Sequence, residues 1–219
     1  LVADAQSLWL TPDSGDLVFA APLHLPRLQT LYIAGCRQPL LEMISGNTLE
    51  AIRTLVVADA SNSLAGISEL GELRRLQTLT IRQQCLEEES VEWVCQEKSI
   101  MSLALTDTNA SDLVISSLGC KHRLKRVDLF RSGVAFEDER LHGERFPAVR
   151  SLDVSETPVS GASIGIIRNV FPELQRLVAQ RTNLTESDIW SIASWEGLTV
   201  LSTDTPGVDF DYHGSDFWD

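Results

Sequence analysis

The chain has 219 residues, of which 43% are hydrophobic, and its 18 basic and 31 acidic side chains give a formal net charge of −13. That charge opposes general attraction to nucleic acid or to anionic membranes, so we expect neither as a partner. No apolar run approaches the ~20 residues of a membrane-spanning helix. The first residues, Leu-Val-Ala-Asp-Ala-Gln, lack the basic and apolar parts of a secretion signal. We therefore expect a soluble protein.

A six-residue pattern, L-x-x-L-x-L, recurs along the chain. It begins in an imperfect form at Ala5, begins again at Leu28, and then returns at intervals of 24 or 25 residues. The copies from Leu28 (Leu-Gln-Thr-Leu-Tyr-Ile) and Leu76 (Leu-Gln-Thr-Leu-Thr-Ile) are nearly identical. An unbroken period predicts one elongated array with no linker between domains. The copies after Leu28 begin at Ile52, Leu76, Ile100, Leu124, Val149, Leu174 and Leu198.

Each unit is predicted to hold a strand followed by a helix or helical turn. Apolar residues at positions 1, 4 and 6 of the pattern alternate as in a half-buried strand. The second half has helical spacing, as where Ile189, Ile192 and Ala193 follow the capping residue Thr185. Since strands pack about 4.8 Å apart and helices about 10 Å apart, the stack must bend with its sheet inside. We expect an α/β solenoid of about nine repeats over residues 1–208, with a concave parallel sheet, and an acidic-aromatic tail at 209–219.

The pattern L-x-x-L-x-L-x-x-[N/C/T] with a helical second half resembles the leucine-rich repeat superfamily over about 200 residues. The repeat length is most similar to the ribonuclease-inhibitor-like and cysteine-containing subclasses, the latter common in F-box substrate receptors. The Thr-rich form is similar to kinetoplastid leucine-rich repeat proteins. Position 9 lacks the usual Asn, so we expect Ser and Thr hydroxyls to fill part of its role. The residues at this position are Cys36, Ala60, Gln84, Thr108, Ser132, Thr157, Thr182 and Pro206.

The resemblance implies that a ligand docks on the concave sheet, which the outward positions 2, 3, 5, 7 and 8 line. Basic residues outnumber acidic ones there between 124 and 181. An acidic or phosphorylated segment of a protein partner suits this patch, because Arg forks match carboxylate and phosphate geometry. A solvated face of internal ion pairs is the alternative. The basic residues are Arg53, Arg82, Lys125, Arg126, Arg131, Arg150, Arg176 and Arg181, and the acidic ones are Asp59, Asp107, Asp128, Asp153, Glu156 and Asp204.

Asp128 and Asp153 occupy the same position of successive units, which predicts two carboxylates roughly 5 Å apart on neighbouring strands. Three interpretations are open: bridging by a nearby Arg, capture of a basic residue of a partner, or a paired-carboxylate catalytic site. Phe130 beside Arg131 has the makeup of an interface anchor, or packs against the next strand. The candidate partner-binding residues of this region are Arg82, Arg126, Asp128, Phe130, Arg131, Asp153, Arg176 and Arg181.

An apolar column forms the second candidate contact. Trp9, Tyr32 and Val56 align at position 5 of successive units, and we take Trp9 and Tyr32 as binding residues. Coverage by an N-terminal cap absent from this chain is the alternative. We assign three helical tryptophans to packing and expect the charged segment 136–145 to be a mobile excursion on the back. These tryptophans are Trp93, Trp190 and Trp195.

The acidic-aromatic tail has two interpretations. Phe210 and Tyr212 are expected to cover the open end of the core, which a solenoid requires for solubility. A partner-binding peptide is open for Phe217 and Trp218.

The cysteines form no C-x-x-C pair and have no His at ligand spacing, so we predict neither a zinc site nor a redox motif. Buried free thiols are expected, with one disulfide between Cys95 and Cys120 left open for an oxidising compartment. Outside the repeats nothing assembles a nucleophile, a base and an oxyanion site, or a phosphate loop. We therefore expect no enzyme and no cofactor.

These observations predict a protein–protein interaction module, as an intracellular (cytoplasmic or nuclear) adaptor or substrate-receptor arm. A secreted or surface recognition protein is the alternative, supported by the glycosylation sequons Asn109-Ala-Ser and Asn183-Leu-Thr. A non-catalytic part of a larger enzyme is a third reading.

Overall fold

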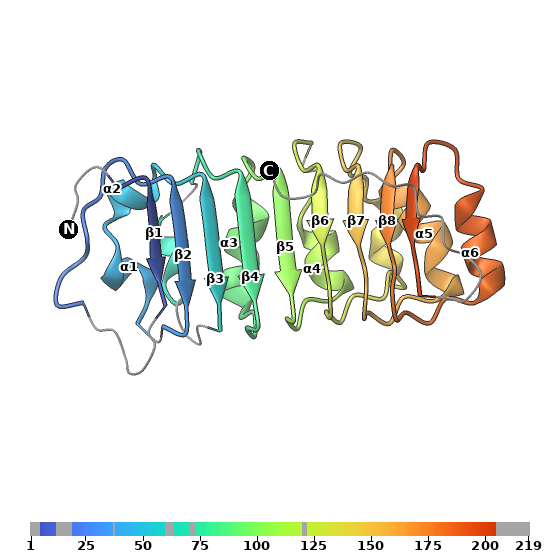
Figure 1. Cartoon of the computed structure of the whole chain (residues 1–219), viewed down its shortest axis with the longest axis horizontal. Coiled ribbons are helices and arrows are strands. Elements are labelled where there is room, and N and C mark those ends of the chain that lie inside the picture. Colours follow the sequence, from blue (N-terminus) through green and yellow to red (C-terminus); the bar gives the residue numbers. More distant parts are fainter. Residues whose placement is uncertain are drawn as a thin grey trace.

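The computed structural model describes residues 5–11, 19–36, 38–59, 64–70, 73–119 and 122–204. Nine parallel strands form one open sheet in which every strand pairs with its neighbour in sequence (Figure 1). This order follows from the repeat, because each unit adds one strand beside the previous one. The strands are β1 (Ser7–Leu10), β2 (Thr30–Ala34), β3 (Thr54–Ala58), β4 (Thr78–Arg82), β5 (Ser102–Thr106), β6 (Arg126–Asp128), β7 (Ser151–Asp153), β8 (Arg176–Val178) and β9 (Val200–Ser202).

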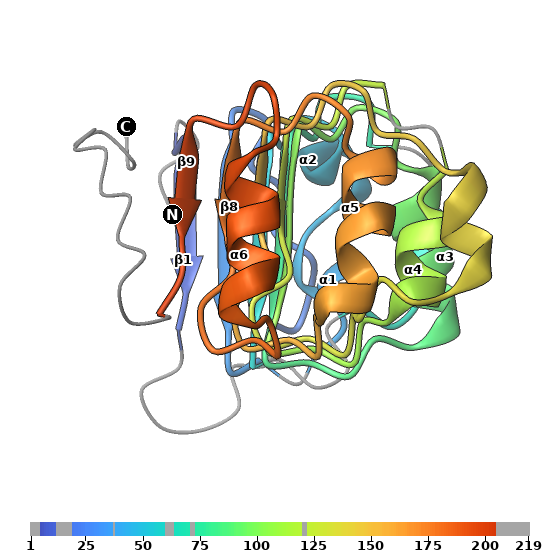
Figure 2. The same ribbon diagram turned by 90° about the vertical axis from the view of Figure 1, so that its right-hand side faces the viewer.

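Short helices follow the strands and cover one face of the sheet (Figure 2). The two end strands, β1 and β9, lie farther from the helices than the middle strands do, so the helix-free face is gently concave. None of the helices in the described residues is long and apolar enough to cross a membrane. The helices are α1 (Leu40–Met43), α2 (Gly46–Leu49), η1 (Ile67–Leu70), α3 (Glu88–Gln96), α4 (Asp112–Ser117), η2 (Glu139–Gly143), η3 (Gly161–Ser163), α5 (Ile164–Val170) and α6 (Glu186–Ala193).

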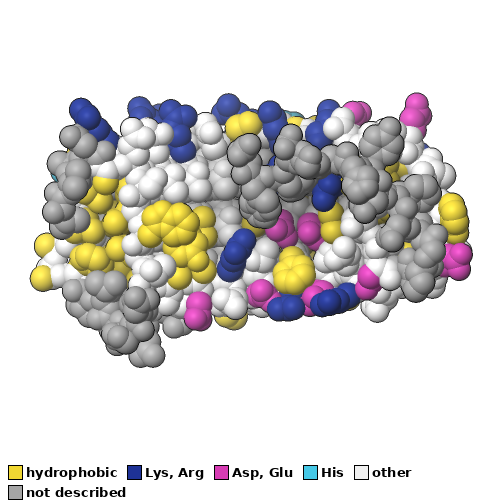
Figure 3. Space-filling model, viewed as in Figure 1, with side chains coloured by type: hydrophobic (Ala, Val, Ile, Leu, Met, Phe, Trp, Pro, Cys, Tyr) yellow, Lys and Arg dark blue, Asp and Glu magenta, His cyan; other side chains and the backbone are white. Residues whose placement is uncertain are grey.

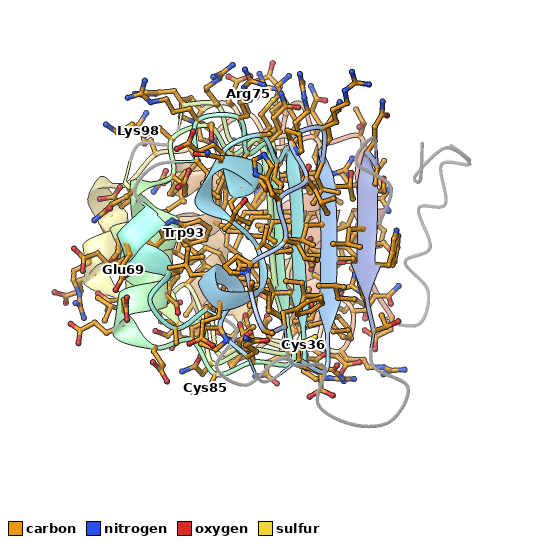
Figure 4. All side chains as sticks on the ribbon, turned by 90° about the vertical axis from the view of Figure 1, so that its left-hand side faces the viewer. Cys36, Glu69, Arg75, Cys85, Trp93 and Lys98 are labelled. Atoms are coloured by element: carbon orange, nitrogen blue, oxygen red, sulfur yellow. The ribbon has the colours of Figure 1, made fainter. Side chains whose placement is uncertain are left out.

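The core lies between the sheet and the helices. Position 4 of each unit points into it, and the register aligns these residues across all nine strands. In β2 to β9 each of them is at most 5% exposed, so the apolar positions stack into one continuous layer. Trp93 of α3 closes the layer from the helix side (Figure 4). The position-4 residues are Leu8, Leu31, Leu55, Leu79, Leu103, Val127, Leu152, Leu177 and Leu201.

Strands β2 to β8 each end in a turn whose position-8 residue has left-handed backbone geometry. The φ angles there lie between 44° and 64°, and glycine fills the position once. The other residues hold a conformation that costs an L-amino acid roughly 1–2 kcal/mol. Their N–H groups continue the sheet ladder, as where Asp107 N–H donates to Phe130 O at 2.9 Å in the next repeat. The position-8 residues are Gly35, Asp59, Gln83, Asp107, Arg131, Glu156 and Arg181.

Threonine hydroxyls at position 9 close the same turn. Thr157 donates from Oγ1 to Val154 O at 2.6 Å, and Thr108 and Thr182 make the same bond back to position 6 of their own units at 3.2 Å. These bonds stay within one repeat and therefore stabilise each turn separately. Ala60 and Pro206 lie outside the described residues.

Two packing predictions were wrong. Segment 136–145 is no mobile excursion, because Phe136 and Leu141 are fully buried and η2 packs against α4 and α5 on the helix side of the molecule. Trp190 is 53% exposed, whereas Trp93 and Trp195 are buried as expected. The tail at 209–219, with its four aromatic residues, lies outside the described residues.

Segment 135–138 is held by one buried carboxylate from the preceding repeat. Asp112, the first residue of α4, is 9% exposed and accepts four backbone N–H groups at 2.7–3.0 Å. The donors include Phe136, whose φ of 55° is left-handed. A carboxylate with two oxygens and four lone-pair sites can satisfy all four donors, which no neutral side chain does.

We expect Asp112→Asn to lower the free energy of unfolding by about 3 kcal/mol, because an amide offers one oxygen and leaves part of this set unpaired. Asp59→Asn is the control: it removes the same charge from an exposed turn and should change stability by less than about 0.5 kcal/mol. Urea unfolding followed by circular dichroism measures both. Equal stability of the two variants would show that the Asp112 carboxylate does not hold this segment.

Candidate functional site

One column of side chains runs along the middle of the helix-free face. It is formed by position 5 of every unit, and the strand register aligns all nine members. The column is apolar over β1 to β3, small or hydroxylic over β4 and β5, and acidic over β6 and β7. Figure 3 shows the corresponding hydrophobic patch and acidic pair on this face. In strand order the members are Trp9, Tyr32, Val56, Thr80, Ala104, Asp128, Asp153, Val178 and Ser202.

The apolar end of the column is an exposed aromatic stack. The rings of Trp9 and Tyr32 lie 4.5 Å apart between centroids, with an interplanar angle of 23°. Their alignment follows from the register, which pairs Trp9 with Tyr32 and Tyr32 with Val56. Trp9 keeps 64% of its surface exposed and is the most exposed large hydrophobic residue among those the structure describes. The stack is therefore set by the strand register and accessible to a partner.

The acidic end of the column brings Asp128 and Asp153 side by side on β6 and β7. Each carboxylate accepts the backbone N–H two residues further on: Asp128 Oδ1 from Phe130 at 3.0 Å, and Asp153 Oδ1 from Ser155 at 2.8 Å. Burial raises the pKa of Asp128 and the Asp153 charge raises it further, against the Phe130 N–H and the charges of Arg82 and Arg126. The ionised Asp128 thus costs the fold some stability.

A ladder of alternating charges follows position 8 at the edge where the strands end. The Arg131 guanidinium contacts Asp107 at 2.9 Å on one side and Glu156 at 2.7 Å on the other, and Arg181 reaches Glu156 at 2.7 Å. The Arg181 N–H also donates to Asp204 at 2.8 Å. These pairs lower the pKa of Glu156 and raise that of Arg131. An acidic guest would have to displace these internal contacts, so Arg131 and Arg181 do not favour one here.

Phe130 lies between the acidic pair and this ladder. It is half-buried, and the Arg131 guanidinium carbon stands 4.9 Å from its ring centroid. Part of the predicted anchor is thus covered by its own neighbour. The remaining candidates surround it: Arg82 ends β4, Arg126 begins β6 and Arg176 begins β8. The structure therefore gathers the predicted charged residues over β4 to β8 and separates them from Trp9 and Tyr32.

Metal ligands do not gather in the part of the chain that the structure describes, where no group of three or more His, Cys, Asp or Glu side chains is placed to hold an ion. Cys36 is buried, and burial raises the pKa of its thiol. Cys120, one of the two cysteines for which a disulfide was left open, lies outside the described residues.

We expect Asp128→Asn to raise the free energy of unfolding at pH 7. Because the pKa of Asp128 is raised in the folded state, the folded chain binds this proton more readily than the unfolded chain does. Wild-type stability therefore falls as pH rises through the interval between the two pKa values, and the gain in the variant should disappear below that interval. The Asn oxygen keeps the bond from Phe130 N–H.

Thermal unfolding at pH 3 to 8 measures this difference. Asp107→Asn is the control, since it removes a charge that pairs with Arg131 and should not stabilise the fold. A lower midpoint for Asp128→Asn at pH 7 would contradict the prediction.

No protein-family model matches the chain, and no curated protein matches it. Among solved structures, an internalin from Listeria monocytogenes str. 4b F2365 aligns with it at 13% sequence identity and a TM-score of 0.49. The alignment covers 83% of this chain and 64% of the internalin chain, so this chain spans less than two thirds of that structure. The repeat period, the sheet in sequence order and the helices on one face give the chain the architecture of a leucine-rich repeat solenoid.

Proposed function

We propose that this chain is a protein–protein interaction module whose partner docks an apolar side chain against the Trp9–Tyr32 stack. The observation that carries the proposal is the exposure of Trp9, at 64%, in an aromatic stack on the helix-free face. Trp and Tyr are enriched among residues that dominate binding energy, because they bury much area with few rotatable bonds. Monomeric proteins seldom leave such a patch in water without use.

The acidic pair makes the two ends of the position-5 column different, one apolar and one acidic. Asp128 and Asp153 lie three and four strands away from the Val56 end of the apolar patch, along the same column. Because ionised Asp128 costs stability, its presence is better explained by a contact than by the fold. A basic residue of the partner would pair with both carboxylates, offset part of their charge and fix the direction in which the partner lies along the sheet.

We further propose an intracellular adaptor or substrate-receptor role, and the thiols support it. Cys36 is buried and Cys85 is exposed, and both are free in the structure, which suits a reducing compartment. The Asn109 amide also supports this role, because it bridges to the preceding repeat: its Oδ1 accepts from Leu86 N–H at 2.6 Å and its Nδ2 donates to Leu86 O at 3.2 Å. The amide thus has a structural task of its own. Glycan mass on Asn109 or Asn183 in the native protein would favour the secreted or surface alternative.

The test is capture of partners from native lysate by the full chain, quantified by mass spectrometry against Trp9→Ala. We expect specific partners to fall at least tenfold, since truncating a central interface tryptophan commonly costs about 2 kcal/mol or more. Trp190→Ala is the matched control, because Trp190 is 53% exposed on α6 and its loss should leave capture unchanged.

Both variants must keep the wild-type thermal midpoint for the comparison to hold. Loss of the same partners with Trp190→Ala, or retention of all of them with Trp9→Ala, would refute docking at the aromatic stack.

A further inference from the structure

A row of cationic side chains follows the edge of the sheet at which the strands begin. We call it the basic edge. In the space-filling view, Lys and Arg side chains line the upper border of the sheet, and in the side view Arg75 and Lys98 stand at the same border (Figures 3 and 4). The segments that lead into six successive strands, β2 to β7, each contribute at least one member. They are Arg27, Arg53, Arg74, Arg75, Lys98, Arg123, Lys125, Arg145 and Arg150.

The sheet ladder keeps this row straight. At position 2, just before each strand, Arg53 N–H donates to Gln29 O, Lys125 N–H to Met101 O, and Arg150 N–H to Lys125 O, each at 2.8 Å. Successive repeats therefore hold their edge residues about 4.8 Å apart. Six repeats give a row roughly 24 Å long, which is the length of about seven residues of an extended chain.

The charges of the basic edge are mostly uncompensated. All its members are exposed except Arg150, which is half-buried and reaches Glu173 at 3.5 Å. Among the described residues, the segments that lead into these strands also carry Glu50, Glu97, Glu144 and Glu173, and Glu97 is buried and accepts the Leu73 N–H at 2.7 Å. Seven members of the edge make no ion pair with a carboxylate of the described residues. These seven are Arg53, Arg74, Arg75, Lys98, Arg123, Lys125 and Arg145.

At the opposite edge of the sheet, where the strands end, the cationic side chains at position 8 are paired with acids. There Arg131 and Arg181 alternate with Asp107, Glu156 and Asp204, and each guanidinium meets an acid within 3 Å. Internal pairing thus neutralises one edge and leaves the other charged, in a chain whose net charge is −13. Such a local field attracts anions whatever the sign of the total charge.

A depression interrupts the basic edge between the segments that lead into β5 and β6. It has a volume of about 500 Å³, and its lining includes Lys98, His122 and Arg123 beside the apolar Leu118. Two cations and an imidazole around one hollow offer several donors to a carboxylate entering it.

We propose that the basic edge binds an extended acidic segment of a protein, about seven residues long, with one carboxylate in the depression at Lys98 and Arg123. Arginines dominate the row, and their planar forks pair carboxylates with two parallel hydrogen bonds. This surface shares no residue with the aromatic stack, and the proposal does not depend on docking there.

Single-stranded nucleic acid fits the edge less well, because it is held by aromatic platforms on which bases stack, and the members of the row are all Arg or Lys. A membrane surface fits less well too, since peripheral binding combines basic charge with inserted apolar side chains. Both become outcomes of the test.

The test is fluorescence anisotropy of a labelled eight-residue peptide of alternating Glu and Asp, with the full chain at 50 mM and 200 mM NaCl. We expect binding at 50 mM that weakens at the higher salt, since the charges involved are exposed. The variant Arg74→Gln, Arg75→Gln, Arg123→Gln should bind at least tenfold more weakly. These residues make no ion pair in the described structure, so the variant should keep the wild-type thermal midpoint.

The control variant Arg82→Gln, Arg140→Gln, Arg181→Gln loses the same charge elsewhere and should bind within twofold of the wild type. An equal loss in both variants, or no wild-type binding at 50 mM NaCl, would overturn the proposal. A photo-crosslinking version of the peptide gives a readout that needs no variant: crosslinks are expected at 97–101 and 122–126, and crosslinks confined to the helix-free face would overturn it.

Two further probes address the class of partner. Tighter binding of a twelve-nucleotide oligothymidylate, or of phosphatidylserine vesicles, than of the peptide would overturn the assignment to an acidic protein segment. Weaker binding of both supports it.

Discussion

The whole molecule depends on one backbone ladder that repeats with the 24- or 25-residue period. It runs from position 2, where Lys125 N–H meets Met101 O, to position 8, where Asp107 N–H meets Phe130 O. Because every repeat makes the same bonds to the next, equal positions of the pattern become neighbours in space. A short list of positions in the sequence thereby becomes a set of straight columns on the surface.

Because of these columns, basic and acidic side chains lie on different borders of the molecule. The edge where strands begin is cationic, the edge where they end alternates in sign, and the helix side carries acids such as Glu88 and Glu89 in the first turn of α3. A net charge of −13 describes none of these surfaces. Association is governed by the local field, so a single chain of this kind can attract anionic and cationic groups on different borders.

Much of this arrangement was predictable from the period alone. A constant spacing fixes the register, and the register places Trp9 beside Tyr32 and Asp128 beside Asp153, as the pattern indicated. The burial of segment 136–145 was not predictable, because its many charges obscure the aromatic residues that pack and because Asp112 holds it from another repeat. The basic edge escaped the pattern too, since six of its nine members precede position 1, outside the strand template.

The left-handed turn at position 8 could not be read from residue type either. Gln83, Arg131 and Glu156 are not residues that favour this conformation, and the inter-repeat hydrogen bond imposes it on them. Long charged side chains are thus set on a rigid turn with fixed spacing. That is why Arg131 reaches acids on both sides.

The alternation of charge at position 8 constrains how such a chain gains or loses repeats. Deleting the one repeat that carries Arg131 would set Asp107 directly beside Glu156, so like charges would meet on adjacent turns. Deleting that repeat together with the next would set Asp107 beside Arg181 and restore an attractive pair. In this half of the solenoid, the ion pairs at position 8 therefore favour the insertion or deletion of repeats in even numbers, because only an even change keeps opposite charges on adjacent turns.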